Sequence, residues 1–391
     1  MITKLKLLSI ASIVLLFFSC QDENSVTQTN TLLTISLEHG EDHAELSVDN
    51  YQVVWTNLSS NRSYEGLTQA DGTLTLEVPQ GIYSLSVEGK SEDVNSANFL
   101  NFQAATREVA ISGAEMLHQC VLEHSVSGDG WLFREIYFSG STTTNNKSYW
   151  QDQYFEIYNN SNEVLYADGL TVAESDYTNT SDNNIWSDLL PGTVAVGTLY
   201  SVPGNGTDYP VNPGSSIILA SNGINHKVVN ENSPVDLSNA DFEWYDEHNL
   251  DTDVPEVPNL IKHFSYSATV WILHTRGYKA YILFHPGEEM SEFMNKNFVR
   301  SFTASGSETV RVGVPIKSVY DAVEISQPEG PASKALPAGL DKGFSYCNGA
   351  NLGVCIKRRV AGEENGRVIL QDTNNSSVDF EANATPDPLM K

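Results

Sequence analysis

The densest group of chemically capable side chains lies in residues 241–256, with the sequence DFEWYDEHNLDTDVPE. This stretch holds seven carboxylates and three neighbouring aromatic residues within 16 positions. Carboxylate oxygens are the ligands that Ca²⁺ prefers, and aromatic rings beside carboxylates suit carbohydrates or cationic ligands. We therefore predict a contact here with a divalent cation, calcium being the candidate, or with a ligand. The residues predicted to form it are Asp246, Asp251, Asp253, Trp244 and Tyr245.

The same stretch has a second interpretation. Asp251-x-Asp253 lacks the Gly and Glu that complete an EF-hand loop, so the motif is not that one. The aromatic residues could instead anchor the loop to a hydrophobic core while the carboxylates face water. The sequence leaves both interpretations open.

Other chemistry receives less support. His39 and His43 stand four residues apart, but Gly40 between them favours a solvated turn over the helix that would place both imidazoles on one zinc ion. The sequence contains no Gly-x-Ser-x-Gly motif and no phosphate-binding glycine loop. These observations favour a protein that is not an enzyme, although a β-sandwich hydrolase can gather carboxylates from distant loops.

Four cysteines divide into one near the N-terminus and three within the body of the chain. Cys347 and Cys355 flank a turn-rich segment that could close a hairpin, so we predict a disulfide between them. Cys120 has no evident partner, and the sequence does not decide whether it is free.

The first 19 residues are typical of a secretion signal. Lys4 and Lys6 precede an apolar run, Leu7–Phe18, whose 12 residues are too few for a helix that crosses a bilayer. The run ends at Ser19-Cys20, which resembles a bacterial lipobox, so we predict that Cys20 becomes the acylated N-terminus. Residues 20–30 would form a polar tether.

An acidic run, Gln21–Asn24, follows Cys20 directly. It resembles the surface-export signal of Bacteroidetes lipoproteins, which implies a location on the outer face of the outer membrane. A tether that is acidic for solubility alone explains the run equally well.

The charge balance is strongly acidic. Removing Lys4 and Lys6 with the signal leaves 20 basic against 50 acidic residues, a net charge of −30. A nucleic-acid-binding protein needs a basic footprint, so nucleic acid is excluded as a partner.

The elements that must position these groups are strands. Apolar and polar residues alternate through much of the chain, with abundant Gly, Asn, Ser and Thr between the alternating runs, which predicts an all-β fold. We expect two consecutive β-sandwiches, over residues 31–125 and 131–391. Asp71-Gly72 predicts a hairpin turn within the first.

Two resemblances refine this division. The order of Asp71-Gly72, Val78-Pro79 and Gly81-x-Tyr83 resembles the carboxypeptidase-regulatory, transthyretin-like sandwich, which implies a structural module. Tyr154–Leu170 resembles the opening hairpin of the lamin-tail domain, an immunoglobulin-like sandwich; we expect one buried face on its first strand and a returning strand at Val164–Tyr166. Cys355–Arg359 and Asp372–Phe380 resemble the segments that close that domain at its C-terminal end. The match has a large insertion at about residues 225–315.

The whole arrangement resembles a Bacteroidetes family of surface lipoproteins classed as a domain of unknown function. We therefore expect a non-enzymatic, lipid-anchored surface protein with a binding or scaffolding role, accessory to an outer-membrane transporter or an adhesion complex. A carboxylate-based hydrolase of surface glycans or phosphoesters is the first alternative, and a purely structural envelope module the second.

Overall fold

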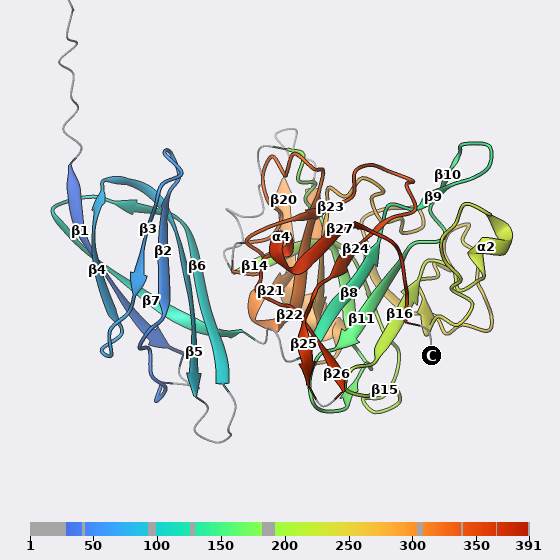
Figure 1. Ribbon diagram of the computed structural model, residues 1–391, viewed down its shortest axis with the longest axis horizontal. Coiled ribbons are helices and arrows are strands. Elements are labelled where there is room, and N and C mark those ends of the chain that lie inside the picture. Colours follow the sequence, from blue (N-terminus) through green and yellow to red (C-terminus); the bar gives the residue numbers. More distant parts are fainter. Residues whose placement is uncertain are drawn as a thin grey trace, which may run out of the picture.

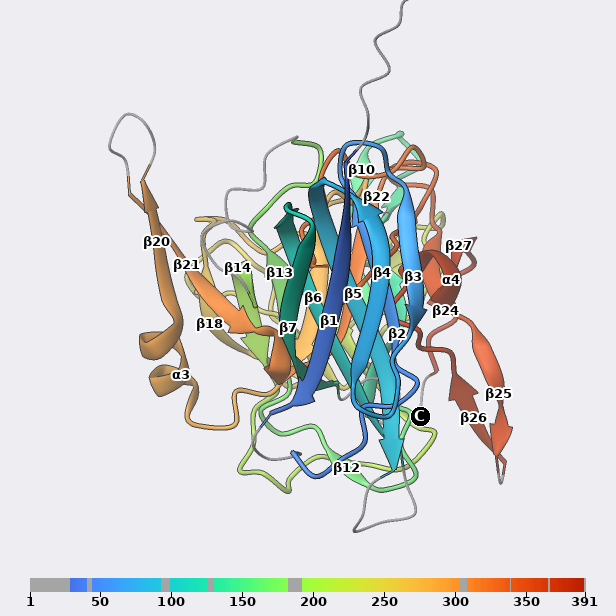
Figure 2. The ribbon, with the colours of Figure 1, turned by 90° about the vertical axis from the view of Figure 1, so that its left-hand side faces the viewer.

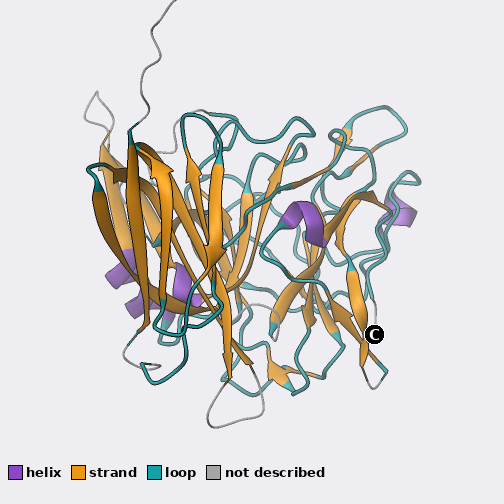
Figure 3. Cartoon of the chain, turned by 60° about the vertical axis from the view of Figure 1, so that its left-hand side comes forward, coloured by secondary structure: helices purple, strands orange, loops and turns teal. Residues whose placement is uncertain are grey.

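The computed structural model describes residues 29–40, 44–92, 99–125, 130–181, 192–302, 308–337, 339–364 and 366–389. The predicted signal, Cys20, most of the predicted tether and His43 lie outside these residues. Strands dominate the described chain and confirm the all-β prediction (Figure 3). Its helices are short: α2 (His226–Val229), α3 (Met290–Asn297), α4 (Ser376–Asp379) and the 3-10 turn η2 (Ile316–Ser318). None of the described helices is both long and apolar enough to cross a membrane.

The N-terminal part, residues 30–125, is one seven-stranded sheet that curls around its own core (Figures 1 and 2). The strand order is β3-β2-β5-β6-β7-β1-β4. The strands are β1 (Asn30–His39), β2 (Gln52–Asn57), β3 (Ser63–Leu67), β4 (Thr73–Pro79), β5 (Gly81–Glu92), β6 (Phe99–Ile111) and β7 (Glu115–Ser125). Alternate residues of β1 are buried, as the period-two pattern predicts, and β1 pairs with β7 in parallel and with β4 antiparallel.

The core of this half is built around aromatic side chains. Tyr51, Trp55 and Tyr83 are each fully buried against the aliphatic residues of β1, β5 and β7. Gly72 turns the chain with a φ of +76°, and Asp71 Oδ1 accepts a hydrogen bond from the Thr73 amide at 3.0 Å. The Gly72 amide donates to the Gln69 carbonyl at 2.8 Å and the Gln69 amide to the Thr73 carbonyl at 2.9 Å, so the predicted turn forms. The strands that it joins, β3 and β4, are not neighbours in the strand order, so no hairpin ladder follows from the turn.

The C-terminal part, residues 130–389, contains a six-stranded and an eight-stranded sheet. The six-stranded sheet has the order β17 (Phe242–Glu243), β16 (Ser216–Ala220), β11 (Tyr154–Asn159), β8 (Trp131–Tyr137), β24 (Cys355–Arg358), β27 (Phe380–Ala384). The eight-stranded sheet has the order β20 (Phe298–Phe302), β21 (Glu308–Pro315), β14 (Thr193–Ser201), β13 (Thr171–Ser175), β19 (Ala280–Phe284), β22 (Val319–Ser326), β23 (Ser345–Tyr346), with β18 (Ile261–Ser265) also on β14.

These two sheets share one hydrophobic core. Phe155 of β11 meets Tyr281 of β19 edge to face, with ring centroids 5.1 Å apart. Trp244 and Trp271 lie at 5.6 and 5.8 Å from the same Phe155 ring. Large aromatic side chains bury much apolar surface and favour such tilted contacts, so this cluster holds the sheets together.

The segment predicted as an insertion, residues 225–315, is partly integral to the second sheet. It supplies β18, β19, β20 and β21, and β19 pairs with β13 on one side and β22 on the other. A chain without this segment would therefore lack an internal strand of the sheet.

The predicted hairpin at Tyr154–Leu170 is not formed. Its first strand, β11, pairs with β8 and β16, whereas the residues predicted to return along it form β12 (Leu165–Tyr166) and pair with β15 (Pro210–Val211). The Asn159 side chain bonds the Ser161 amide and the Glu163 carbonyl, at 3.0 and 2.8 Å, and directs the chain away from β11.

Every residue of β11 is buried, whereas the alternation predicted one buried face. Its outward face is covered by segments remote in sequence. One of these is the hairpin of β25 (Val360–Glu364) and β26 (Arg367–Leu370), which projects beside the sheet (Figure 2). A further small pair is formed by β9 (Ser141–Thr142) and β10 (Ser148–Tyr149).

Candidate functional site

The acidic segment 241–256 is anchored in the core at its first part, Phe242–Trp244, whereas most of residues 247–256 are exposed. Trp244 is 1% exposed, and its indole N–H donates to the Trp271 carbonyl at 3.0 Å. It therefore anchors the segment in the core and cannot form a ligand-facing wall. Tyr245 beside it is half-buried.

The three predicted oxygen donors each have a partner within the protein. Asp246 is buried and pairs with Lys262; burial opposes the charge, but the hydrogen bonds from Lys262 and Asn249 outweigh it and lower the pKa of Asp246. Asp251 accepts the Asp246 amide at 3.0 Å, and Asp253 accepts the Asn259 side chain at 2.8 Å.

No group of three or more His, Cys, Asp or Glu side chains in the described part of the chain is arranged to hold a metal ion. The carboxylates of this loop thus mainly accept hydrogen bonds that stabilise the turns of the loop itself. A lysine, Lys262, supplies the positive charge that the prediction assigned to calcium.

The predicted disulfide is absent. Cys347 and Cys355 are free, as is Cys120, and all three are buried. The Cys347 thiol donates to the Val354 carbonyl at 3.6 Å and the Cys355 thiol to the Ala384 carbonyl at 3.5 Å. The Ser139 hydroxyl also donates to the Val354 carbonyl, at 2.6 Å, so hydrogen bonds close this loop without a covalent bridge.

His39 does not face solvent as predicted. It ends β1, is 7% exposed and packs on Phe102 with ring centroids 4.0 Å apart. Its Nε2 lies 3.1 Å from the Ser47 carbonyl. These contacts make it a core residue of the first sheet.

A concave site exists elsewhere, on the outward face of the six-stranded sheet. A cavity of about 610 Å³ lies beneath the β25–β26 hairpin, and we call it the hairpin cleft. It is lined by Arg134, Tyr158, Asn162, Pro213, Gly214, Lys357, Arg358, Val360, Glu364, Gly366, Arg367, Val368, Leu370 and Leu389. Four cations and one carboxylate among these residues make the lining unlike the acidic chain as a whole.

The floor of the cleft is set by the register of three strands. Glu135 of β8 pairs with Glu156 of β11 on one side and with Lys357 of β24 on the other. Arg134 Nη1 donates to Glu156 Oε2 at 2.5 Å, and the Ser216 hydroxyl donates to Glu156 Oε1 at 2.6 Å. Burial raises the pKa of Glu156, although the Arg134 charge opposes this.

Glu135, like Glu156, is fully buried beneath the cleft. It accepts a hydrogen bond from the Tyr154 hydroxyl and lies 3.4 Å from Lys357 Nζ. The two carboxylates closest to the floor are thus occupied by hydrogen bonds inside the protein, and neither faces the cavity. This arrangement does not resemble the pair of accessible carboxyl groups that glycoside hydrolysis requires.

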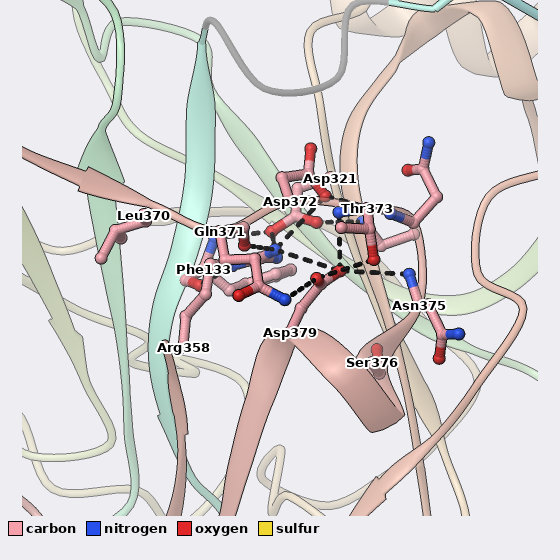
Figure 4. A network of polar contacts seen from close by, with 12 residues as sticks. Phe133, Asp321, Arg358, Leu370, Gln371, Asp372, Thr373, Asn375, Ser376 and Asp379 are labelled. Atoms are coloured by element: carbon pink, nitrogen blue, oxygen red, sulfur yellow. Dashed lines mark hydrogen bonds and ion pairs between the residues drawn. The ribbon is translucent and has the colours of Figure 1, made fainter. Parts of the chain in front are cut away.

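Arg358, at the end of β24, ties the floor to two other segments (Figure 4). Its guanidinium donates to the Phe133 carbonyl at 2.8 Å and to Asp321 at 2.5 Å. Asp372 accepts from it at 3.3 Å, and Asp379 lies 4.0 Å away. Burial raises the pKa of Asp372 to about 6, while Arg358 opposes the shift.

The segment that resembles the end of the lamin-tail domain, Asp372–Phe380, forms a loop around the Asp379 carboxylate. Asp379 accepts the Thr373 amide at 2.9 Å, the Thr373 hydroxyl at 2.8 Å and the Asn375 amide at 3.1 Å. The motif is therefore a folded turn that encloses the Arg358 charge. Because buried charges need such complete pairing, its role is structural.

The hairpin wall is fixed to β11 and the turn after it. The Tyr158 hydroxyl donates to the Val368 carbonyl at 2.7 Å. The Asn160 side chain accepts the Leu370 amide at 2.8 Å, and Arg367 donates to the Asn160 carbonyl. These bonds hold β26 at a set distance from the sheet and keep the cleft open between them.

Residues 386–389 form another wall of the hairpin cleft. The Asp387 amide donates to Glu135 at 3.0 Å, and its carbonyl accepts from Arg134 at 3.1 Å. Its carboxylate lies 3.4 Å from Lys357 Nζ, and Leu389 lines the cavity beyond it. Chemically, the site offers cations beside apolar side chains, which is a binding surface for a molecule with both characters.

Sequence reasoning missed this cleft. The basic run Lys357-Arg358-Arg359 is unusual in so acidic a chain and is a signal that could have pointed to it. Arg134 and Arg367 stand 233 positions apart in the chain, and only the fold brings them to one cavity.

Comparison with known proteins matches part of the C-terminal region to one family model. Residues 212–387 match the family model described as "Protein of unknown function (DUF4876)", so the chain carries a DUF4876 family domain. A DUF4876 family protein from Bacteroides thetaiotaomicron has a similar crystal structure, with a TM-score of 0.60 and 25% identity over 91% of this chain and 96% of that one.

Two further crystal structures show much weaker likeness. One is a candidate adhesin from Bacteroides ovatus, with 9% identity, a TM-score of 0.20 and coverage of 72% of this chain and 82% of that one. The other is a DUF3823 family protein from Parabacteroides merdae, with 14% identity, a TM-score of 0.17 and coverage of 46% and 94%. No curated protein matches the chain. The lamin-tail and carboxypeptidase-regulatory resemblances are not confirmed by these matches and stay predictions.

Proposed function

We propose that this protein is a non-enzymatic, lipid-anchored surface protein that binds a ligand in the hairpin cleft. The observation that carries the proposal is the cleft itself. Its volume of about 610 Å³ falls in the range of sites that enclose small molecules, and it combines an apolar lining with a few fixed polar groups.

Binding fits the lining better than catalysis. The carboxylates Glu135 and Glu156 lie under the floor with their oxygens occupied, and Arg358 is enclosed by its acidic partners. These groups hold the surface in one shape. A rigid, pre-formed surface lowers the entropy lost when a ligand binds, so it serves recognition directly.

The proposed location at the cell surface rests on the sequence. The short apolar run that ends at Ser19-Cys20 supports lipidation of Cys20, and the acidic run after it supports display on the outer face of the outer membrane. A tethered binding protein in this position would serve a transport or adhesion complex by holding ligand near it. No metal or cofactor is needed for this role.

The ligand site is tested by photo-crosslinking on intact cells. A photoreactive amino acid replaces Val360, which lines the cleft and is 61% exposed; the matched control carries it at Leu58, which is 48% exposed in the turn after β2. We expect a discrete adduct at Val360 that is missing at Leu58. Equal labelling at both positions, or none at Val360, contradicts the proposed site.

The proposed lipid anchor is tested by a separate experiment. Replacing Cys20 with Ser removes the thiol that would carry the acyl chains, so the protein should leave the membrane fraction and migrate differently on a gel. Retention in the membrane pellet with unchanged mobility would contradict the lipid anchor.

A further inference from the structure

The four cations of the hairpin cleft fall into two kinds. Arg134 pairs with Glu156, and Arg358 pairs with Asp321, and both of these carboxylates are no more than 3% exposed. Breaking such a pair would leave a buried charge without a partner, which is strongly unfavourable. Arg134 and Arg358 are therefore fixed parts of the structure.

Lys357 and Arg367 each have one fixed partner inside the protein and one exposed carboxylate partner. Lys357 lies 3.4 Å from the buried Glu135, and Arg367 donates to the Asn160 carbonyl. Lys357 faces the Asp387 carboxylate at 3.4 Å, and Arg367 faces the Glu364 carboxylate at 3.1 Å. These carboxylate side chains are 73% and 63% exposed. Exposed ion pairs contribute little to stability, because water solvates both partners well when they separate. An incoming anion can replace either carboxylate at small cost.

Asp387 is held at the cleft by its backbone rather than by its side chain. Its amide donates to Glu135 at 3.0 Å, and its carbonyl accepts from Arg134 at 3.1 Å. The carboxylate makes a single long contact, with Lys357 Nζ. The side chain can therefore rotate into solvent while the segment 386–389 stays in place.

An apolar surface lies beside these two cations. Val360, Val368 and Leu389 line the cleft and are 61%, 39% and 44% exposed. Apolar side chains exposed within a concavity gain free energy when a ligand covers them. The cleft thus presents apolar side chains beside two cations, each of which has one exposed carboxylate partner that can leave.

From this arrangement we infer that the ligand of the hairpin cleft carries a carboxylate or phosphate beside an apolar ring or chain. Its anionic group takes the place of the Asp387 carboxylate on Lys357, and its apolar part covers Val360, Val368 and Leu389. Asp387 is then an internal competitor that lowers the affinity for any anion. This inference rests on the proposed function, since it names the ligand class of the same site.

Three probes of similar shape test the inference: phenylacetate, phenyl phosphate and the neutral phenylacetamide. Binding to the full chain is measured by ligand-observed NMR titration. We expect either or both anions to bind at least about tenfold more tightly than phenylacetamide, since tenfold corresponds to one replaced ionic contact of ordinary strength. Which anion binds better identifies the group as carboxylate or phosphate.

Two variants assign the contact. Lys357→Met keeps the side-chain length but removes the charge, and it should weaken anion binding about tenfold. Asp387→Asn removes the competitor and should tighten anion binding about threefold, which is a fraction of one such contact. The controls Lys227→Met and Glu115→Gln make the same charge changes at exposed positions outside the cleft lining and should leave binding unchanged.

The outcomes separate the inference from the proposed function. Equal binding of phenylacetamide and the anions overturns the anionic ligand class but leaves a binding cleft. Absence of binding by all three probes, with the Val360 crosslink retained, also overturns the inference alone. If Lys357→Met proves unfolded by circular dichroism, the exposed Asp387→Asn variant still decides: unchanged anion affinity in that variant overturns the proposed competition.

Discussion

At the scale of single residues, buried polar groups rather than exposed ones distinguish this protein. Asp152 is fully buried, and its Oδ2 accepts hydroxyl hydrogen bonds from Ser141, Ser233 and Tyr137 at 2.6, 2.8 and 3.2 Å. Its Oδ1 has no hydrogen-bond partner among the residues that the structure describes. Burial raises the pKa of Asp152 to about 6, even though the hydroxyl groups oppose the shift.

Replacing Asp152 with Asn should flatten the pH dependence of stability. A carboxyl whose pKa is higher in the folded state binds more protons there than in the unfolded chain, so its contribution to the free energy of unfolding is present at about pH 4 and is lost as the pH rises through about 6. The loss is at most about 3 kcal/mol, because one pKa unit is worth about 1.4 kcal/mol.

Urea denaturation at pH 4, 5.5 and 7 measures the effect. Glu115→Gln, an exposed position on β7, is the control and should keep the dependence of the wild type. Identical pH slopes for Asp152→Asn and the wild type would contradict the assignment.

The three described cysteines lead to a second prediction at this scale. Burial raises the pKa of the Cys120 thiol to about 11 and that of Cys347 to about 12, and that of Cys355 rises further. Thiolate is the reactive form, so all three should resist alkylation in the native protein and react once it unfolds. Mass spectrometry after iodoacetamide treatment with and without urea checks this. A peptide with Cys347 bridged to Cys355 would contradict the free thiols.

At the scale of elements, the β25–β26 hairpin makes the cleft. All residues of β25 are exposed, so the hairpin lacks a core of its own and relies on its contacts with β11 and Asn160. An isolated two-stranded hairpin is only marginally stable in water. The hydrogen bond from Tyr158 to the Val368 carbonyl therefore matters more here than in a larger sheet.

The variant Tyr158→Phe removes that hydrogen bond and keeps the ring. We expect a loss of about 1 kcal/mol in local stability and faster hydrogen exchange at the β26 amides, since the Val368 carbonyl loses its donor. The matched control is Tyr166→Phe, whose ring is 45% exposed on β12. Equal exchange in β26 for wild type and Tyr158→Phe would show that the hairpin is held by other contacts.

At the scale of the whole molecule, the hydrophobic cluster of the first sheet is separate from the clusters of the later sheets. The seven-stranded sheet encloses its own cluster around Trp55, and the aromatic cluster around Phe155 lies between the two later sheets. The halves lie side by side (Figure 1), and Lys342 pairs with Glu88 across them. An exposed ion pair contributes little to stability, so the halves should fold independently.

A fragment of residues 21–125 should therefore unfold cooperatively by itself. Its one tryptophan, Trp55, is fully buried and reports the transition by fluorescence. A single sigmoidal urea transition that coincides with the loss of circular dichroism is expected for one cooperative core. A gradual, non-cooperative change would mean that the first sheet depends on the second half.

The strand-rich class follows from the residue pattern alone, because alternating apolar residues stabilise a strand wherever it pairs. The sequence also determined the acidic charge balance and the leader pattern, which are properties of composition. It could not determine strand partners: β12 pairs with β15 rather than β11, since a period of two identifies faces but no neighbours. Trp244 shows the same limit, because an aromatic residue that anchors a loop and one that lines a ligand site have the same local pattern.

The position of the proposed ligand site depends on the folded arrangement of remote segments. The hairpin cleft takes Arg134 from β8, Gly214 from a loop before β16, Lys357 from β24 and Leu389 from the last described segment. These positions share no spacing or motif. Their proximity follows from sheet register and from remote segments that cover β11, and both arise from long-range packing of the chain.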